Sequence, residues 1–337
     1  MTSSSLESSG PKSGKYAHVA VLMGGWSAER EVSLRSGAAS ADALEQAGYK
    51  VTRIDVDRAI AQKLATVRPD ACFNALHGRW GEDGCIQGIL ECLQIPYTHS
   101  GVLASALAMH KGQAKRVLAA AGVPVADDAI VDREAAAVSH AMAPPYVAKP
   151  IAEGSSVGVV IVPVGANKPP ESIRTIPTLG HEIMVERYVA GRELTCGVIG
   201  ERVTAIIDIV PARLRHDVPA RLRHDVPAET MEFYDYEAKY APGGSRHILP
   251  ASIPAEIYKA VQGYTLAAHR ALGCRGVSRS DFRWDDTKGG NGELICLEVN
   301  TQPGMTGTSL VPELAGHAGM SFVELVAWMI EDASVDR

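Results

Sequence analysis

The sequence predicts a mixed α/β protein with more than one domain. The chain has 337 residues, whereas a single domain typically has about 150. Its N-terminal part alternates apolar strands with helices, which is typical of an open parallel sheet. Further along, strands follow one another without helices between them, which is typical of antiparallel sheets. We therefore expect an N-terminal α/β domain with an open parallel sheet, followed by α+β domains.

The N-terminal elements are separated by glycine-rich turns. Ligands of parallel sheets bind beyond the carboxyl ends of the strands, where Glu29 and His77 lie. A dinucleotide fingerprint needs a third glycine that the turn after the first strand lacks, so a nicotinamide dehydrogenase is disfavoured. The predicted elements are a strand at 16–23, a helix capped by Ser27 and ended by Gly48, strands at 50–56 and 71–76, and a helix at 85–93.

The composition is that of an ordinary globular protein. Hydrophobic residues make up 46% of the chain and charged residues 21%. The net charge of -6 gives no support to binding of nucleic acid or of an anionic membrane. No apolar run approaches the roughly 18 residues of a membrane span, and the serine-rich start lacks the apolar centre of a signal peptide. We therefore expect a disordered tail at 1–15 and a cytoplasmic protein.

The six cysteines are scattered through apolar stretches of the chain. They form no C-x-x-C pair, and no histidine lies near them at metal-binding spacing. We expect buried thiols rather than disulfides or zinc ligands.

A loop rich in glycine and serine, at 151–158, follows a strand that ends with Lys149 and precedes a short apolar strand. The backbone N–H groups of such a hairpin loop can cover phosphates, and Lys149 would supply a positive charge. A surface hairpin with a solvated lysine fits the same residues. The helix predicted at 103–121 carries two further lysines, Lys111 and Lys115.

The same loop contains the pattern G-x-S-x-G at 154–158, which is that of a nucleophile elbow with Ser156 as the nucleophile. An elbow requires a helix directly after the turn. The apolar residues 159–162 precede a proline and predict a strand instead. A serine hydrolase is therefore only an alternative function.

An octapeptide is repeated without change at 210–217 and 218–225. Two copies are too few for a solenoid, and the recurring prolines interrupt regular structure. We interpret the duplication as an exposed loop insertion at 210–228; an anion-binding patch of its arginines and histidines is the alternative. The aromatic and charged segment 233–244 fits a loop that covers a substrate, with a packed tyrosine cluster as the alternative.

Two strands near the C-terminus concentrate polar side chains on one face. The two-residue period of a strand places Glu298 with Asn300 on one of them, and Arg279 with Asp281 and Arg283 on the other. If the strands are neighbours, carboxylates and an amide meet beside an arginine. Oxygen ligands of this kind suit Mg²⁺ that is shared with substrate phosphates. A structural ion pair of Arg279 with Asp281 or Glu298 is the alternative.

Two helices complete the predicted C-terminal part. One, at 254–272, is ended by Gly273 and leads into the polar strands. The other begins at a capping box formed by Ser321 and Glu324. Its apolar residues recur at helical spacing, so we expect one face to pack into the core.

Five motifs occur in a fixed order along the chain. They are G-G-x-S-A-E-R-E-V-S at 24–33, H-G-R-x-G-E-D-G at 77–84, K-P at 149–150 with E-G-S-S-V-G at 153–158, the aromatic segment 233–240, and E-x-N with P-G-M at 298–305. Together they resemble the D-alanine:D-alanine ligase family of the ATP-grasp superfamily. The resemblance extends from about residue 19 to residue 333.

The resemblance implies a three-domain ATP-grasp architecture. In this architecture two α+β domains enclose ATP, and the parallel-sheet domain precedes them. The implied boundaries are 16–101 for the N-terminal domain, 102–187 for the central domain and 188–337 for the C-terminal domain, with the duplicated loop inside the last. The resemblance also implies a homodimer.

The resemblance further implies ligation of two D-alanines for peptidoglycan. ATP would phosphorylate the carboxylate of the first D-alanine, and the amine of the second would attack the acyl phosphate. Two Mg²⁺ ions, or Mn²⁺ in their place, would assist. Carried over by position, the ATP-binding residues would be Lys111, Lys149, Glu186, Arg187, Glu193 and Lys239, and the metal ligands would be Asp281, Glu298 and Asn300.

For the amino-acid substrates, the resemblance implies that Glu29 binds the ammonium of the first D-alanine and that His77 lies near its carboxylate. Arg279 and the backbone of Gly304 would stabilise the tetrahedral intermediate. The carboxylate of the second D-alanine would lie at Ser309 and Leu310, and Ser155 and Tyr240 would close the covering loop with Glu29. A non-catalytic amino-acid-binding protein is the remaining alternative.

Overall fold

The computed structural model describes residues 14–154, 158–211 and 245–336. Contacts within the chain divide it into two compact units. Unit 1 comprises residues 1–81, 85–99 and 304–337, and unit 2 comprises residues 82–84 and 100–303. The three domains implied by the resemblance stay a prediction.

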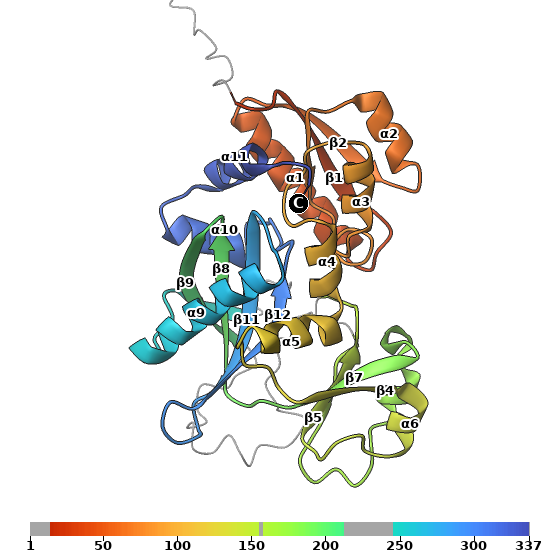
Figure 1. The fold of residues 1–337 in the computed structure, drawn as a ribbon, viewed down its shortest axis with the longest axis vertical. Coiled ribbons are helices and arrows are strands. Elements are labelled where there is room, and N and C mark those ends of the chain that lie inside the picture. The colour runs from red at the N-terminus through yellow and green to blue at the C-terminus, as the bar shows by residue number, and fades with distance from the viewer. Residues whose placement is uncertain (1–13, 155–157, 212–244, 337) are drawn as a thin grey trace, which may run out of the picture. The chain divides into compact units, whose positions relative to one another are not determined.

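Unit 1 is built on a parallel three-stranded sheet in the order β2-β1-β3 (Figure 1). This arrangement confirms the predicted alternation of strands and helices. Because β1 and β3 are parallel neighbours, the turns after them emerge at the same edge of the sheet. The strands are β1 (His18–Gly24), β2 (Lys50–Val56) and β3 (Ala71–Asn74), and the described helices are α1 (Arg30–Gln46), α2 (Ile60–Val67), α3 (Cys85–Cys92), α10 (Leu310–His317) and α11 (Phe322–Asp332).

The core of unit 1 joins the two ends of the chain. Leu22, Phe73 and Tyr97 are fully buried at its centre, and α11 packs against α1. Tyr97 also forms isolated β-bridges with Cys72 and Ser334. The C-terminal segment is therefore an integral part of the N-terminal fold.

The predicted helix cap at Ser27 is wrong. The helix α1 begins after Glu29, and the side chain of Glu29 makes no capping bond. Ser27 Oγ instead donates to the carbonyl oxygen of His77 at 2.6 Å and accepts from Glu29 N at 3.2 Å. The serine thus fastens the turn after β1 to the segment after β3.

The single helix predicted at 103–121 is two helices, α4 (Val102–Met109) and α5 (Lys111–Ala120). His110 separates them with an extended backbone, at φ -86° and ψ 92°. Its Nδ1 accepts a hydrogen bond from Gln113 N at 3.3 Å, so the imidazole caps α5. The helix pattern in the sequence continues through this break because most of the flanking residues favour helix.

Unit 2 contains two antiparallel sheets (Figure 1). In the four-stranded sheet, Tyr146, Ala148, Ile183 and Val185 lie in one apolar core. Since side chains alternate between the faces of a strand, the neighbouring polar residues occupy the opposite face. The sheet has the order β4-β7-β5-β6, with β4 (Asp128–Asp132), β5 (Tyr146–Pro150), β6 (Val160–Val162) and β7 (Glu182–Arg187), accompanied by α6 (Arg133–Val138), α7 (Ser172–Thr175) and the 3₁₀ helix η1 (Pro177–Leu179).

The strand β6 follows the G-x-S-x-G turn closely, since it begins at Val160. The helix that a nucleophile elbow requires is not found at this place. Ser156 itself lies outside the described residues. The structure therefore gives no support to the serine hydrolase alternative.

The five-stranded sheet has the order β10-β9-β8-β11-β12, and every neighbouring pair is antiparallel. Its apolar face includes Leu194, Cys196, Phe282 and Trp284, which share a core with buried residues of α9 and α5. The elements are β8 (Arg192–Ile199), β9 (Arg202–Pro211), β10 (Ser245–Ile248), α9 (Ala255–Ala271), β11 (Val277–Asp285) and β12 (Glu293–Asn300).

All six cysteines are free thiols, as predicted. The expectation of burial is confirmed for Cys72, Cys196, Cys274 and Cys296 but is wrong for two. Cys85 and Cys92 lie on the outer side of α3 and are exposed, because Ile86 and Leu90 take the buried side. Within the described residues, no helix is both long enough and apolar enough to cross a bilayer.

The predicted capping box of α11 is confirmed. Ser321 Oγ accepts from Glu324 N at 3.3 Å, and Glu324 Oε2 accepts from Ser321 N at 2.8 Å. We predict that Ser321→Ala lowers the free energy of unfolding by about 1 kcal/mol, because one backbone N–H of the first turn loses its partner. Chemical unfolding measures this change. Ser321→Thr keeps the hydroxyl and should remain close to the unmodified protein; an equal loss in both variants would contradict the capping role.

Candidate active site

The strands β11 and β12 are antiparallel neighbours, as the sequence predicted. Arg279 lies opposite Asn300, and Asp281 lies opposite Glu298. Opposed residues of antiparallel strands share a face, so the four polar side chains gather on one side of the sheet. The next pair is Phe282 with Cys296, which leaves Leu297 as a bulge in β12.

Asp281 is held by hydrogen bonds from two sides. It accepts from Arg279 Nε at 2.8 Å and from Arg279 Nη2 at 2.7 Å, in a bidentate pair. Thr195 Oγ1, on the adjacent strand β8, donates to Asp281 Oδ1 at 2.6 Å. The ion pair that the sequence offered as an alternative is therefore present, and it orients the carboxylate.

Glu298 lies next to a lysine from α5. Its Oε2 is 3.6 Å from Lys111 Nζ, and the Glu298 side chain is 33% exposed. Lys111 Nζ also donates to the carbonyl oxygen of Glu153 at 2.5 Å. The ammonium thus connects β12 to the start of the glycine-rich loop that follows β5.

The oxygen atoms on β11 and β12 fit a hard cation that shares its coordination with a ligand. Among the described residues, no group of three or more histidine, cysteine, aspartate or glutamate side chains could enclose a metal. Asp281 and Glu298 supply two carboxylates, and Asn300 adds an amide oxygen that accepts from Gln302 N at 2.8 Å. Mg²⁺ is commonly bound through one or two carboxylates together with substrate phosphates, so this donor set matches that mode.

A buried ionic group, which we call the Glu186 cluster, lies on the polar face of the four-stranded sheet. Glu186 Oε1 accepts from Lys115 Nζ at 2.6 Å, and Glu186 Oε2 accepts from Lys149 Nζ at 2.5 Å. Asp128, which is opposite Glu186 in the sheet, has its Oδ1 3.0 Å from Lys115 Nζ. The Glu186 cluster consists of these four residues, which α5, β4, β5 and β7 contribute.

The two lysines keep Glu186 ionised. Burial alone would raise the pKa of Glu186, but the charges of Lys149 and Lys115 outweigh that effect and hold the pKa below its usual value. Only 3% of Glu186 is exposed. An unpaired carboxylate at this depth would be strongly unfavourable, so Glu186 depends on both ammonium groups.

Two further predicted nucleotide residues, Arg187 and Glu193, are also engaged in ion pairs. Arg187 Nη2 lies 2.6 Å from Glu293 Oε1, which links β7 to β12. Glu193 Oε2 lies 3.5 Å from Arg283 Nη1. Arg283 shares the polar face with Arg279 and Asp281, as predicted, and its guanidinium forms this ion pair with β8.

In unit 1, the predicted residues Glu29 and His77 lie in adjacent turns. Glu29 is 7% exposed and His77 is 6% exposed. A Cβ built on Gly78 would lie 2.6 Å from Glu29 Oε2, so the carboxylate rests against this glycine, whose φ is +72°. His77 Nε2 lies 3.0 Å from Ser36 Oγ, which fixes the ring against α1.

A second group of predicted residues in unit 1 surrounds the start of α10. A Cβ built on Gly304 would lie 2.9 Å from Ser309 Oγ. Ser309 Oγ accepts from Thr306 N at 2.9 Å, and Leu310 is the first residue of the helix. The structure thus places Gly304 against Ser309, the residue that precedes Leu310 and α10.

Three predicted site residues, Ser155, Lys239 and Tyr240, lie outside the described residues, as does the segment 233–244. Two members of the Glu186 cluster, Lys115 and Asp128, were not predicted as site residues. The four-residue spacing of Lys111 and Lys115 puts both lysines on one side of α5, and this spacing was the available signal. Nothing in the sequence near Asp128 indicated its contact.

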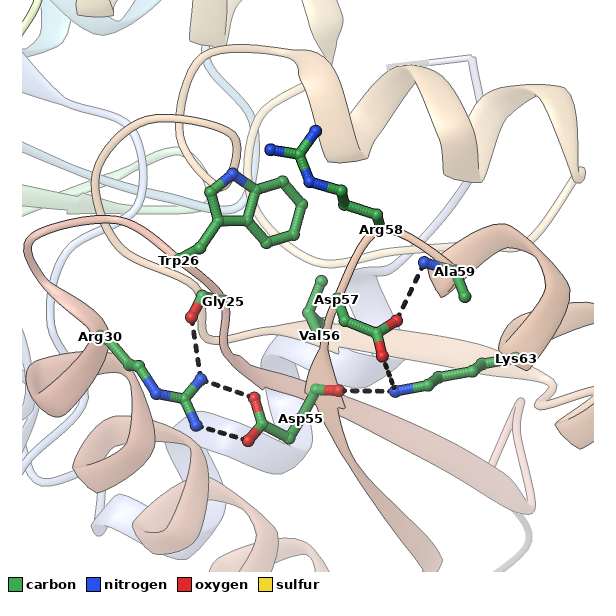
Figure 2. Close-up of a pocket in the computed structure, with 9 residues that line it drawn as sticks. All are labelled: Gly25, Trp26, Arg30, Asp55, Val56, Asp57, Arg58, Ala59 and Lys63. Atoms are coloured by element: carbon green, nitrogen blue, oxygen red, sulfur yellow. Dashed lines mark hydrogen bonds and ion pairs between the residues drawn. The ribbon is translucent and has the colours of Figure 1, made fainter.

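A pocket of about 720 Å³ lies in unit 1, and none of the predicted substrate residues is among those that line it. Figure 2 shows that Arg30 pairs with both oxygens of Asp55, and that Lys63 pairs with Asp57. These four charged side chains that line the pocket are therefore paired with one another. The Trp26 ring forms one wall, with the Arg58 guanidinium carbon 5.6 Å from the ring centre.

Comparison with known proteins supports one family along most of the chain. The family model described as "D-ala D-ala ligase N-terminus" matches residues 58–100, and the model described as "D-ala D-ala ligase C-terminus" matches residues 117–331. The D-alanine–D-alanine ligase of Parvibaculum lavamentivorans is 62% identical over 321 residues, which are 95% of this chain and 98% of the relative. The corresponding ligase of Methylobacterium radiotolerans is 60% identical, with 95% and 99% covered.

Solved structures agree in fold. The crystal structure of D-alanine–D-alanine ligase from Bacillus anthracis matches with a TM-score of 0.74 and 30% identity, covering 94% of this chain and 97% of that one. The structure of the same enzyme complexed with ATP matches with a TM-score of 0.73. The polar strands, the ordered motifs and these likenesses together establish that the chain belongs to the D-alanine–D-alanine ligase family, whose architecture is the ATP-grasp fold.

Proposed function

We infer that this chain is an ATP-dependent ligase that joins two D-alanines into D-alanyl-D-alanine for peptidoglycan synthesis. The observation that carries this inference is the identity of 62% and 60% with two D-alanine–D-alanine ligases over 95% of the chain. The polar faces of both sheets in unit 2 support it, because they present carboxylates and ammonium groups suited to a nucleotide and its metal.

The reaction proceeds in two steps. The γ-phosphoryl group of ATP passes to the carboxylate of the first D-alanine, which gives an acyl phosphate and ADP. The amine of the second D-alanine then attacks the acyl carbon, and phosphate leaves. Such transfers need little covalent chemistry from the protein, which contributes positioning and stabilisation of charge.

For the nucleotide, we assign Lys111 and Lys149 to the ATP phosphates. Both ammonium groups belong to unit 2 and lie at the start of the glycine-rich loop: Lys149 is in β5, which precedes the loop, and Lys111 donates to the carbonyl oxygen of Glu153. Glu186, Arg187 and Glu193 are assigned to the adenosine, and Lys239 to the γ-phosphate. The ATP-complexed relative supports binding of ATP by this fold.

For the metal, we assign Asp281, Glu298 and Asn300 as ligands of Mg²⁺, with Mn²⁺ as the alternative ion and two ions per site. When bound, the metal neutralises negative charge on the phosphates. Arg279 and Thr195 hold the Asp281 carboxylate in place, and Lys111 stands beside Glu298. Arg279 also supplies a positive charge for the tetrahedral intermediate.

For the amino acids, we assign Glu29 to the ammonium of the first D-alanine and His77 to the region of its carboxylate. The packing of the Glu29 carboxylate against Gly78, with Ser27 bridging to His77, supports a fixed position for the carboxylate. Gly304, Ser309 and Leu310 are assigned to the intermediate and to the carboxylate of the second D-alanine. We further propose a cytoplasmic homodimer that does not bind nucleic acid or membranes.

The reaction type can be tested by phosphate release. With ATP, Mg²⁺ and D-alanine, we predict continuous release of phosphate and formation of D-alanyl-D-alanine, whereas L-alanine and D-lactate should give little release. Coupled phosphate detection and mass analysis of the product measure both. Absence of release that depends on D-alanine would overturn the proposed ligase and would favour a non-catalytic amino-acid-binding protein.

The metal assignment predicts that one variant loses activity but keeps its stability. Glu298→Gln should lower kcat about 100-fold, because the neutral amide no longer balances the charge of a divalent cation. Its stability should change by less than about 0.5 kcal/mol, since the Glu298 side chain is 33% exposed. Steady-state kinetics and thermal unfolding are the measurements.

Glu201→Gln serves as the control, because this glutamate is in the same unit and its side chain is 81% exposed. It should leave both kcat and stability unchanged. Similar kinetics in the two variants would show that Glu298 is not a metal ligand.

A further inference from the structure

The Glu186 cluster contains two lysines whose surroundings differ. Each oxygen of the buried carboxylate accepts from one ammonium group, at 2.6 Å from Lys115 and 2.5 Å from Lys149. The two cations therefore compete for one anion. How the anion is shared depends on what else each ammonium group contacts.

Lys115 has a complete set of acceptors. Besides Glu186, its Nζ donates to the carbonyl oxygen of Ala126 at 2.6 Å and lies 3.0 Å from Asp128 Oδ1. An ammonium group has three N–H donors, and three oxygens surround this one. Only 3% of Lys115 is exposed. Its charge is thus balanced within the protein, and it has no donor left for a ligand.

Lys149 is the opposite case. Glu186 is the one acceptor that the described residues provide for its Nζ. Two of its three N–H donors remain for another group, although its side chain is only 10% exposed. A nearly buried ammonium with two unused donors is suited to an anionic ligand.

We propose that Lys115 is a positioning residue for the nucleotide, which is itself paired with Asp128 and holds one oxygen of Glu186, so that Glu186 neutralises the charge of Lys149 only in part. This inference rests on the proposed function, in which Lys149 contacts the ATP phosphates. Lys115 does not touch ATP. It acts by limiting how far Glu186 can neutralise Lys149.

The proposal predicts opposite effects for the two neighbours of Glu186. Without Lys115, both oxygens of Glu186 are available to Lys149, the remaining Lys149, Glu186 and Asp128 carry a net negative charge, and ATP loses a charge-assisted hydrogen bond. Without the charge of Asp128, Lys115 depends more strongly on Glu186, and Lys149 retains more of its positive charge. A residue that only stabilised the fold would not give changes of opposite sign.

The experiment compares Lys115→Met, Lys115→Arg and Asp128→Asn in the full-length enzyme. We expect Lys115→Met to raise the KM for ATP about tenfold, while the KM for D-alanine stays within about twofold. Lys115→Arg should recover most of the loss, because it keeps the charge, and Asp128→Asn should lower the KM for ATP about twofold. Calorimetric titration with a non-hydrolysable ATP analogue should give the same order of affinities.

Lys259→Met, on the exposed side of α9, is the charge-matched control and should change neither KM. Thermal unfolding of each variant identifies those that do not fold, and Asp128→Asn tests the proposal independently if Lys115→Met is unfolded. An unchanged KM for ATP in a folded Lys115→Met, or a rise in Asp128→Asn, would overturn the proposal. Failure of the unmodified enzyme to use ATP would instead overturn the proposed function.

Discussion

The pairing of β11 with β12 is the constraint on which the chemistry of unit 2 depends. One register places Asp281 opposite Glu298 and sends Phe282 to the other side, into the core beneath α9. Because side chains alternate along a strand, the same hydrogen bonds that build the sheet also separate charge from apolar surface. The packing of the core and the placement of the carboxylates are therefore determined by the same strand register.

The four-stranded sheet also separates an apolar face from a polar one, and its charged residues are buried more deeply. Its apolar face supplies stability, and its other face holds Asp128, Lys149 and Glu186 close to α5. Burying a carboxylate is unfavourable unless cations and hydrogen bonds compensate. The compensation here comes from two lysines on different elements, so α5 and β5 must both dock before Glu186 is accommodated. Such a group favours one arrangement of these elements over looser alternatives.

Local sequence patterns predicted the structure correctly where the residues concerned belong to a single helix or strand. The two-residue period predicted the shared face of Glu298 and Asn300, and the spacing of Ser321 and Glu324 predicted the capping box. The failures lie where contacts join distant residues. Ser27 bonds to the segment after β3, 50 residues away, instead of capping its own helix.

Lys115 illustrates the same limit for the candidate site. Its partner Glu186 lies 71 residues further along the chain, so no local pattern reports the contact. The helix predicted to carry Lys115 was also too long, because the break at His110 depends on the backbone conformation of one residue and not on the composition of the segment. The role of a polar residue within a predicted helix can therefore be assigned only once the tertiary structure is known.

The bulge at Leu297 has a consequence for the evolution of chain length. Phe282 lies opposite Cys296 and Asp281 opposite Glu298, so the extra residue lets Cys296 and Glu298, two positions apart in β12, face opposite sides of the sheet. Elsewhere the chain carries an eight-residue duplication, at 218–225, without interrupting the family motifs on either side. A one-residue difference in length at Leu297 therefore leaves Glu298 opposite Asp281, whereas the same difference within the regular pairs of β12 would turn the side chains beyond it to the other face.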